Sequence, residues 1–283
     1  MPHTDIISVP QLEAIVGSPD TVVFDVRFSL SDEDCGRKAY QAAHLPGAVY
    51  LHLNDDLSGQ VGPATGRHPL PSVARFTDLM RGAGVSEGTQ VIAYDDAGGA
   101  FAARLWWLLK WLNHSAVALL DGGFQAWLAA GGTTDALTPA ARRESQFTPV
   151  EQRQLVFSAD EVSRGLQTGA IVLVDARAPE RFRGEIEPID TKAGHVRGAV
   201  NIPYMHNLRD DGHFKATVDL REIHSQTQAG RKVVCMCGSG VTACHNILAN
   251  VISGNDMPVL YGGSWSEWIT DPNRKIETAD SVA

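Results

Sequence analysis

The sequence has few features that would place the protein in a membrane, on nucleic acid or in an oxidising compartment. No stretch approaches the ~18–20 uninterrupted apolar residues of a membrane span, and residues 1–20 lack the basic segment and apolar run of a signal peptide. Acidic residues outnumber basic ones by 33 to 24, and the net charge of −9 disfavours nucleic acid and anionic membranes as partners. Four cysteines in 283 residues do not make a disulfide framework. We therefore expect a protein of the reducing cytoplasm.

The chain is long enough for one large domain or two ordinary ones, and an internal repeat favours two. Four landmarks of the first half recur in the second half in the same order. The pairs are 22-VVFDVR-27 with 171-IVLVDAR-177, 44-HLPGAVYL-51 with 195-HVRGAVNI-202, 91-VIAYDD-96 with 232-KVVCMC-237, and 122-GGFQAW-127 with 263-GSWSEW-268. The repeat predicts two similar domains, at residues 1–135 and 155–283, joined by a polar and non-periodic linker within 133–154.

Each half alternates short β-branched runs with helical segments. The expected strands lie at 22–26, 91–94, 117–120, 171–176, 233–236 and 258–261, and the expected helices include 101–112 and 241–252. The strand segments are short, apolar and bounded by turn residues, as buried parallel strands are. This alternation predicts an α/β fold, in which each domain is a parallel sheet with helices on both faces.

Three of the four cysteines lie within ten residues, in 233-VVCMCGSGVTACHN-246. Zinc would need four nitrogen or sulfur ligands in a recognisable spacing, and no second paired element faces Cys235 and Cys237. A disulfide between these two residues would strain the end of a strand. We therefore expect no metal here, and we expect Cys235 and Cys244 to pack as small buried hydrophobic residues.

Cys237 differs from its neighbours because an apolar strand ends there and a glycine-containing loop and a helix follow. Gly238 and Gly240 let the backbone curl so that successive N–H groups point at the sulfur. The N-terminus of the helix adds partial positive charge, and both effects lower the pKa of a thiol. The pattern predicts a nucleophilic cysteine in an anion-binding loop. It is not the Cys-x5-Arg loop of cysteine phosphatases, since residue 243 is alanine.

These motifs resemble those of tandem-domain rhodanese-type sulfurtransferases, and 237-CGSGVTAC-244 resembles the active loop of the 3-mercaptopyruvate sulfurtransferases. The resemblance covers nearly the whole chain. It implies that Cys237 accepts sulfane sulfur as a persulfide and passes it to cyanide or to a thiol, such as that of a thioredoxin-like protein. No other cofactor is implied. Asp95 stands at the matching place in the first half, which implies a catalytically silent first domain.

The resemblance also implies roles for residues around Cys237. Ser239 would polarise the substrate thiol or relay a proton, linked to His44 and to one acid of 32-DED-34, among which the sequence does not choose. Arg181 matches the family's substrate-binding arginine and would hold a carboxylate with two parallel hydrogen bonds. The loop residues expected to bind substrate are Gly238, Gly240, Val241 and Thr242. His68, in the proline-rich 66-GRHPLP-71, is a weaker candidate for lining the cleft, and Arg177 is expected in a structural ion pair.

Two features of the sequence favour different sulfur donors. Gly238 and Ser239 are neutral, whereas members of the family that prefer thiosulfate usually carry cations at these positions, so the loop favours 3-mercaptopyruvate. The mercaptopyruvate enzymes usually carry a second arginine after a Glu-Pro pair, where this chain has Ile189, and this favours thiosulfate. We expect 3-mercaptopyruvate, with thiosulfate as the alternative. A third hypothesis, from another class, is a non-enzymatic persulfide carrier that docks a partner protein.

Overall fold

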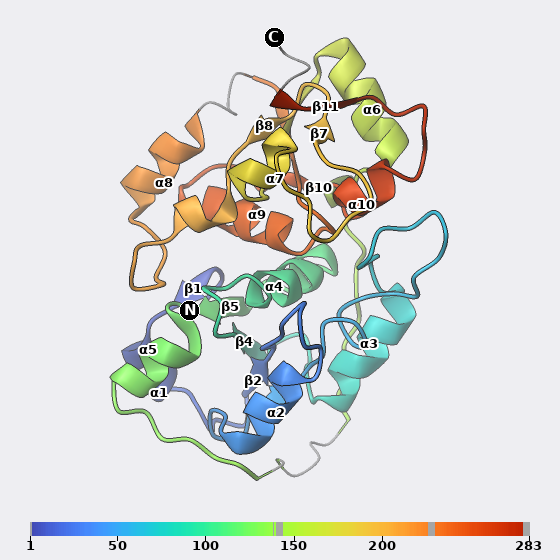
Figure 1. The fold of residues 1–283 in the computed structure, drawn as a ribbon. Helices are drawn as coiled ribbons and strands as arrows, with labels where there is room; N and C mark the ends of the chain where they lie inside the picture. Colours follow the sequence, from blue (N-terminus) through green and yellow to red (C-terminus); the bar gives the residue numbers. More distant parts are fainter. Residues whose placement is uncertain (1, 138, 140–143, 226–229, 280–283) are drawn as a thin grey trace. The chain divides into compact units, whose positions relative to one another are not determined.

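The computed structural model describes residues 2–137, 139, 144–225 and 230–279, and its contacts divide the chain into two compact units (Figure 1). Unit 1 comprises Met1–Gly59, Leu70–Gln152 and Arg209–Phe214, and unit 2 comprises Gln60–Pro69, Arg153–Leu208 and Lys215–Ala283. Each unit thus includes one short segment from the other half of the sequence, a feature that the predicted division at 135 and 155 does not contain. Within the described residues, no helix has the length and apolarity to cross a bilayer.

Unit 1 contains a five-stranded sheet in the order β1-β5-β4-β2-β3, with every pair of neighbouring strands parallel. The strands are β1 (Ile6–Ile7), β2 (Thr21–Asp25), β3 (Val49–Tyr50), β4 (Gln90–Tyr94) and β5 (Val117–Leu120). The helices are α1 (Val9–Glu13), α2 (Cys35–Ala42), α3 (Val73–Gly82), α4 (Ala102–Trp111) and α5 (Gly123–Ala129).

Helices cover both faces of the unit 1 sheet (Figure 1). On one face, Leu12 of α1 and Trp127 of α5 pack with Val23 and Ile92 of the central strands. Successive strand residues point to opposite faces, so neighbours such as Phe24, which is also buried, point to the other face. There α4 packs against β4 and β5. Burial on both faces explains why these strands are continuous apolar runs rather than alternating ones.

Unit 2 contains a four-stranded parallel sheet in the order β10-β9-β6-β8 and a separate antiparallel pair, β7 with β11. The strands are β6 (Ile171–Asp175), β7 (His195–Val196), β8 (Val200–Asn201), β9 (Lys232–Met236), β10 (Val259–Leu260) and β11 (Ile276–Glu277). The α-helices are α6 (Ala159–Thr168), α7 (Pro179–Arg183), α8 (Thr217–Ile223), α9 (Thr242–Ile252) and α10 (Ser264–Trp268), and the 3₁₀ helices are η1 (Arg153–Leu155) and η2 (Tyr204–Asn207).

The two sheets share one topology. The order β5-β4-β2-β3 of unit 1 corresponds to β10-β9-β6-β8 of unit 2. Even the edge pairing recurs, since Ile7 pairs with Leu120 in unit 1 and Val156 forms a parallel bridge with Leu260 in unit 2. The predicted α/β fold, with two similar domains built on parallel sheets, is therefore confirmed.

A buried Asp–Arg pair follows the first long strand of each unit. In unit 1 the guanidinium of Arg27 donates to both carboxylate oxygens of Asp25, and in unit 2 Arg177 binds Asp175 in the same way. All four residues are at most 3% exposed. Removing one partner would leave an uncompensated buried charge, so the pair fixes the chain after each strand. The structural role expected for Arg177 agrees with this geometry.

His224, directly after α8, lies in a buried amide network of unit 2. Its Nε2 is 2.9 Å from Oδ1 of Asn207, and its Nδ1 is 3.0 Å from Nδ2 of Asn250. Because the Asn250 amide nitrogen donates, Nδ1 accepts and Nε2 carries the hydrogen, which is the neutral imidazole. Burial lowers the pKa of His224 to about 4.

We expect His224 to make the protein less stable in mild acid. Its folded pKa of about 4 lies below the ordinary 6.5, so the unfolded chain takes up the proton first. The stability that neutral His224 contributes is present when the pH is above the ordinary pKa. It is lost as the pH falls toward the folded pKa, and the loss is about 2 kcal/mol between pH 7 and pH 5. Urea unfolding of the wild type and of His224→Gln at both pH values measures it. Equal pH dependence in the two proteins would contradict the prediction.

Candidate active site

The loop that follows β9 holds Cys237 with its sulfur facing backbone N–H groups. Its Sγ accepts hydrogen bonds from the N–H of Gly240 at 3.1 Å and from that of Ser239 at 3.4 Å. Helix α9 begins at Thr242, so its positive N-terminal end follows the loop directly. Cys237 is 3% exposed. The two N–H dipoles and the helix end together favour negative charge on the sulfur.

The loop keeps its shape because it is bound tightly to the segment that follows β10. Gly240 has a left-handed φ of +79°, and a Cβ atom there would lie 2.3 Å from the carbonyl oxygen of Gly262. In the same segment, Oγ of Ser264 accepts from the N–H of Cys237 at 3.1 Å, and the N–H of Trp265 donates to the Cys237 carbonyl at 3.0 Å. The position of the nucleophile is therefore set by contacts of the loop backbone with this segment.

Ser239 forms a hydrogen bond with His68, which belongs to the Gln60–Pro69 segment of unit 2. Oγ of Ser239 and Nδ1 of His68 are 2.8 Å apart, and both side chains are buried. The two residues before His68 fix its place. A Cβ atom on Gly66 would lie 2.4 Å from the Gly263 carbonyl oxygen, and the N–H of Arg67 donates to Oγ of Ser266 at 3.1 Å. The serine–histidine contact is therefore built into the fold of unit 2.

His44, which we had expected to pair with Ser239, packs within unit 1. Its Nδ1 lies 2.6 Å from the Tyr40 carbonyl oxygen, and its ring stacks on that tyrosine with a centroid distance of 3.9 Å. Nε2 lies 3.2 Å from the carbonyl oxygen of Leu137. His195, its counterpart in unit 2, stacks on Phe182 at the same centroid distance. The expectation for His44 is corrected, because the ring fills a packing position common to both repeats and His68 makes the bond to Ser239.

The three candidate acids for His44 make other contacts. Asp32 pairs with Lys38, and the carbonyl of Glu33 lies 3.1 Å from Nε2 of His52. Asp34 is the residue before α2. In the part of the chain that the structure describes, none of the three contacts His44.

Arg181, on α7, lies beside the cysteine loop and is held by two acids. Its Nη2 donates to Oε1 of Glu187 at 2.7 Å and to Oδ2 of Asp190 at 3.2 Å. Burial alone would raise the pKa of Glu187, but hydrogen bonds from Arg181 and from the backbone of Asp190 and Ile189 outweigh it, so this pKa lies below its usual range. A Cβ atom on Gly238 would lie 3.6 Å from both Nη atoms of Arg181. The predicted arginine therefore does approach the loop.

Arg67 is a second guanidinium at the loop, and the motifs of the sequence did not select it. Its Nη1 pairs with Oδ1 of Asp190, the carboxylate that also binds Arg181. Its Nη2 would lie 2.8 Å from a Cβ atom on Gly238. Arg67 reaches this place only through the docking of the Gln60–Pro69 segment. The one signal in the sequence is its position next to His68 in 66-GRHPLP-71.

The other residues near Cys237 lie in the loop, at the start of α9 or in the core. Gly238 and Gly240 flank Ser239, and the N–H of Gly240 points at the sulfur. Val241 caps α9 and is 5% exposed, and Thr242 is the first residue of that helix. Cys235 and Cys244 are fully buried, and burial raises the pKa of the Cys235 thiol. Both therefore fit the packing role expected for them.

The equivalent loop of unit 1 is filled by its own carboxylate. Oδ1 of Asp95 accepts from the N–H groups of Ala97 at 2.9 Å and Gly99 at 2.8 Å, and Oδ2 accepts from those of Phe101 and Ala102, both at 2.8 Å. Asp95 is 1% exposed. The anion site of this loop is thus occupied by the chain itself, and a catalytically silent first domain stays a prediction.

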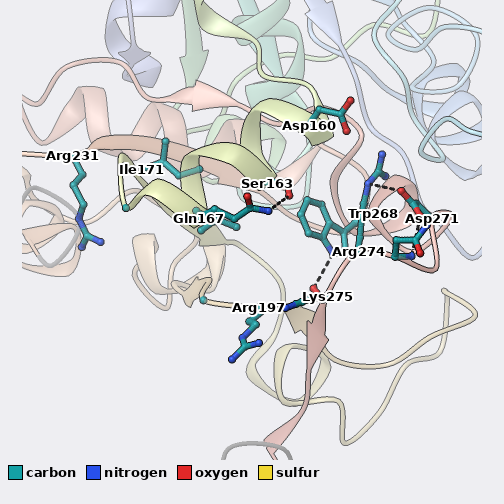
Figure 2. A pocket seen from close by; sticks show the side chains of 14 residues that line it. Asp160, Ser163, Gln167, Ile171, Arg197, Arg231, Trp268, Asp271, Arg274 and Lys275 are labelled. Carbon is teal, nitrogen blue, oxygen red and sulfur yellow. Dashed lines mark hydrogen bonds and ion pairs between the residues drawn. The ribbon is translucent and has the colours of Figure 1, made fainter.

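A pocket of about 640 Å³ in unit 2 contains none of the predicted site residues (Figure 2). Trp268 forms part of its wall, with its Nε1 donating to the Lys275 carbonyl at 3.1 Å, and Arg274 pairs with Asp271. Its lining consists of Asp160, Ser163, Leu166, Gln167, Gly169, Ile171, Arg197, Gly198, Arg231, Trp268, Asp271, Asn273, Arg274 and Lys275. None of the four cysteines lines it, so the cysteine loop remains the candidate active site.

Comparison with known proteins gives a consistent result. The model of the rhodanese-like domain matches residues 8–130 and 158–271. The Pseudomonas aeruginosa protein named "Probable 3-mercaptopyruvate sulfurtransferase" is 44% identical, over 99% of this chain and 100% of that protein. The thiosulfate sulfurtransferase of Rattus norvegicus is 34% identical, over 88% of this chain and 85% of that protein. The solved structure of 3-mercaptopyruvate sulfurtransferase from Leishmania major matches with a TM-score of 0.83 and 31% identity, over 95% of this chain and 75% of that chain.

We expect the two loop glycines to respond differently to alanine. In Gly240→Ala, a left-handed φ and a clash with backbone should cost ~1–3 kcal/mol of unfolding free energy and turn the N–H away from the sulfur. In Gly238→Ala, the added Cβ meets only the ends of two arginine side chains, which can move. We therefore expect a loss below ~1 kcal/mol for this matched variant. Urea denaturation of both proteins measures the difference, and equal losses would refute this account of the loop.

Proposed function

Because the chain belongs to the rhodanese-like family of sulfurtransferases, we propose that it moves sulfane sulfur from 3-mercaptopyruvate, through a persulfide on Cys237, to a thiol or to cyanide. The observation that carries this proposal is the sulfur of Cys237 in its N–H cradle, next to the Ser239–His68 pair. The acceptor proposed for the cell is a thiol of the thioredoxin-like kind in the reducing cytoplasm.

The first half-reaction forms an S–S bond and breaks a C–S bond. The thiolate of Cys237 attacks the sulfur of 3-mercaptopyruvate, and the C–S electron pair leaves with the carbon as the enolate of pyruvate, which then takes up a proton. In the second half-reaction the acceptor thiolate attacks the outer sulfur, and the Cys237 thiolate is the leaving group. The N–H groups of Ser239 and Gly240 stabilise the negative sulfur that begins and ends this cycle.

The Ser239–His68 pair is suited to moving the proton of the donor thiol. The hydroxyl lies on the residue two positions after the nucleophile, and its oxygen is 2.8 Å from Nδ1 of His68. When Nδ1 accepts, Ser239 can take the proton of the donor thiol as its own proton passes to the imidazole. We assign to His68 the role that the resemblance had suggested for His44.

Arg181 supports the choice of a donor with a carboxylate. Its guanidinium lies beside Gly238, near enough to the nucleophile to hold one end of a small donor. The neutral residues Gly238 and Ser239 place no cation against the transferred sulfur itself. Ile189 is the observation that favours the second candidate, a thiosulfate sulfurtransferase, since it removes the expected second arginine, and the similarity to the rat thiosulfate sulfurtransferase agrees with it.

The donor is tested by kcat/KM for 3-mercaptopyruvate and for thiosulfate, with cyanide as acceptor and Cys237→Ser as the blank. We expect a preference for 3-mercaptopyruvate of at least tenfold, which corresponds to about 1.4 kcal/mol of differential transition-state binding. A preference for thiosulfate would replace the proposed donor. A stable persulfide without turnover on either donor would instead favour a sulfur carrier.

The proton pathway predicts different effects on the two donors. Ser239→Ala and His68→Gln should each lower kcat with 3-mercaptopyruvate by about 10²-fold, and the double variant little further, because the two residues act as one unit. Thiosulfate has no thiol proton, so its turnover should fall less. His206→Gln, at an exposed histidine of unit 2, is the matched control. Equal losses with both donors would argue against proton transfer by this pair.

A further inference from the structure

The pocket of about 640 Å³ in unit 2 lies at the opposite end of the sheet from Cys237 (Figure 2). Its lining includes Ile171, the first residue of β6, and Arg231, which directly precedes β9. Cys237 follows the other end of β9, and the five residues of this strand span about 16 Å. The pocket has the size of a small-molecule site, and the chemistry proposed for Cys237 does not use it.

The pocket carries an excess of positive charge, although the whole chain has a net charge of −9. The cations that line it are Arg197, Arg231, Arg274 and Lys275, and the acids are Asp160 and Asp271. Figure 2 shows both acids on the side of Arg274, away from Arg197 and Arg231. Arg274 also pairs with Asp271. The excess of positive charge therefore lies on the side of Arg197 and Arg231.

Two of these cations stand opposite each other across an antiparallel pair of strands. In β7 and β11, Val196 lies opposite Ile276. The N–H of Arg197 donates to the carbonyl of Lys275 at 3.3 Å, so these two residues continue the register by one position. Side chains at opposite positions lie on one face with their Cβ atoms about 5 Å apart, and like charges placed there repel each other. An anion bound between Arg197 and Lys275 would remove this repulsion.

Only part of this positive charge is neutralised by the protein. Glu277 pairs with Nε of Arg197 at 3.0 Å, and the Arg197 side chain is still 60% exposed. Arg231 and Lys275 are exposed, and neither has an ion-pair partner in the part of the chain that the structure describes. Glu277 thus offsets one of three positive charges. A ligand with two negative charges would neutralise the rest.

The pocket also offers apolar and amide surface to the body of a ligand. Leu166 and Ile171 belong to its lining, and the side-chain amide of Gln167 donates to Oγ of Ser163 at 3.3 Å. Figure 2 shows Gln167 between Arg231 and Arg274. A lining of this kind, with a few charged groups around apolar surface, fits an organic ligand better than a bare inorganic ion.

We propose that this pocket binds a small organic anion with at least two negative charges, on phosphate or carboxylate groups, through Arg197, Arg231 and Lys275. An arginine can hold either group with two parallel hydrogen bonds, and a lysine acts as a point charge. The site is separate from the cysteine loop, and the proposal does not depend on which sulfur donor the protein uses.

The test is calorimetric titration of the full chain in about 0.15 M salt with three probes. ADP carries phosphate groups, citrate carries carboxylates, and adenosine is the uncharged comparison. We expect ADP or citrate to bind at one site per chain with a Kd below about 1 mM, and adenosine not to bind. Arg231→Gln and Lys275→Gln should each raise this Kd about tenfold, the effect of one lost charge-assisted hydrogen bond. Arg164→Gln, at an exposed arginine of α6 outside the lining, is the matched control and should keep the wild-type Kd.

Binding of ADP alone would assign the site to phosphate groups, and binding of citrate alone would assign it to carboxylates. Cys237→Ser and Arg181→Gln should both keep the wild-type Kd, which separates this site from the cysteine loop and from failure of the proposed function. The proposal is overturned if neither anion saturates a site. It is also overturned if Arg164→Gln weakens binding as much as Arg231→Gln does, or if binding is lost in Arg181→Gln and kept in Arg231→Gln.

Discussion

Negative charge held by backbone N–H groups at the end of a central parallel strand is the constraint on which each unit depends. In unit 2 the N–H groups of Ser239 and Gly240 face the sulfur of Cys237, and in unit 1 four N–H groups bind the carboxylate of Asp95. A loop at this place has donors that need an acceptor, since strand and helix both leave them unpaired. A permanent carboxylate satisfies them and closes the site. A cysteine places a reactive sulfur at the same donors, so this loop can take part in a reaction cycle.

The second constraint is the close packing of three backbone segments in unit 2. The cysteine loop and the Gln60–Pro69 segment both meet the segment that follows β10. A Cβ atom on Gly240 would lie 2.3 Å from the Gly262 carbonyl oxygen, and one on Gly66 would lie 2.4 Å from that of Gly263. This packing brings Ser239 to His68 without a flexible connection. Geometry of this kind is preorganised, so little reorganisation is needed when charge develops on the sulfur.

The sequence predicted the parts of the structure that depend on local patterns. Buried parallel strands, the cysteine loop before α9 and the Asp175–Arg177 pair all follow from short stretches of chain, and the repeat extended each inference to both halves. His44 was the wrong choice because the motif around it also fits a packing position, where the ring stacks on Tyr40 as His195 stacks on Phe182. His68 and Arg67 could not be selected firmly, because they join the site through docking of a segment from the first half of the sequence, and no local pattern encodes this docking.

Ile189 shows why a missing motif residue is a weak argument about a site. What a donor carboxylate needs is a second cation at a suitable distance from the nucleophile, and the chain can supply it from any segment that reaches this point. Here Glu187 accepts the N–H groups of Ile189 and Asp190, which shapes the loop so that Asp190 lies between Arg181 and Arg67. A second guanidinium group, that of Arg67, thus reaches this loop from another segment of unit 2. Function in this family is therefore better inferred from the charges around Cys237 than from the spacing of arginines along the sequence.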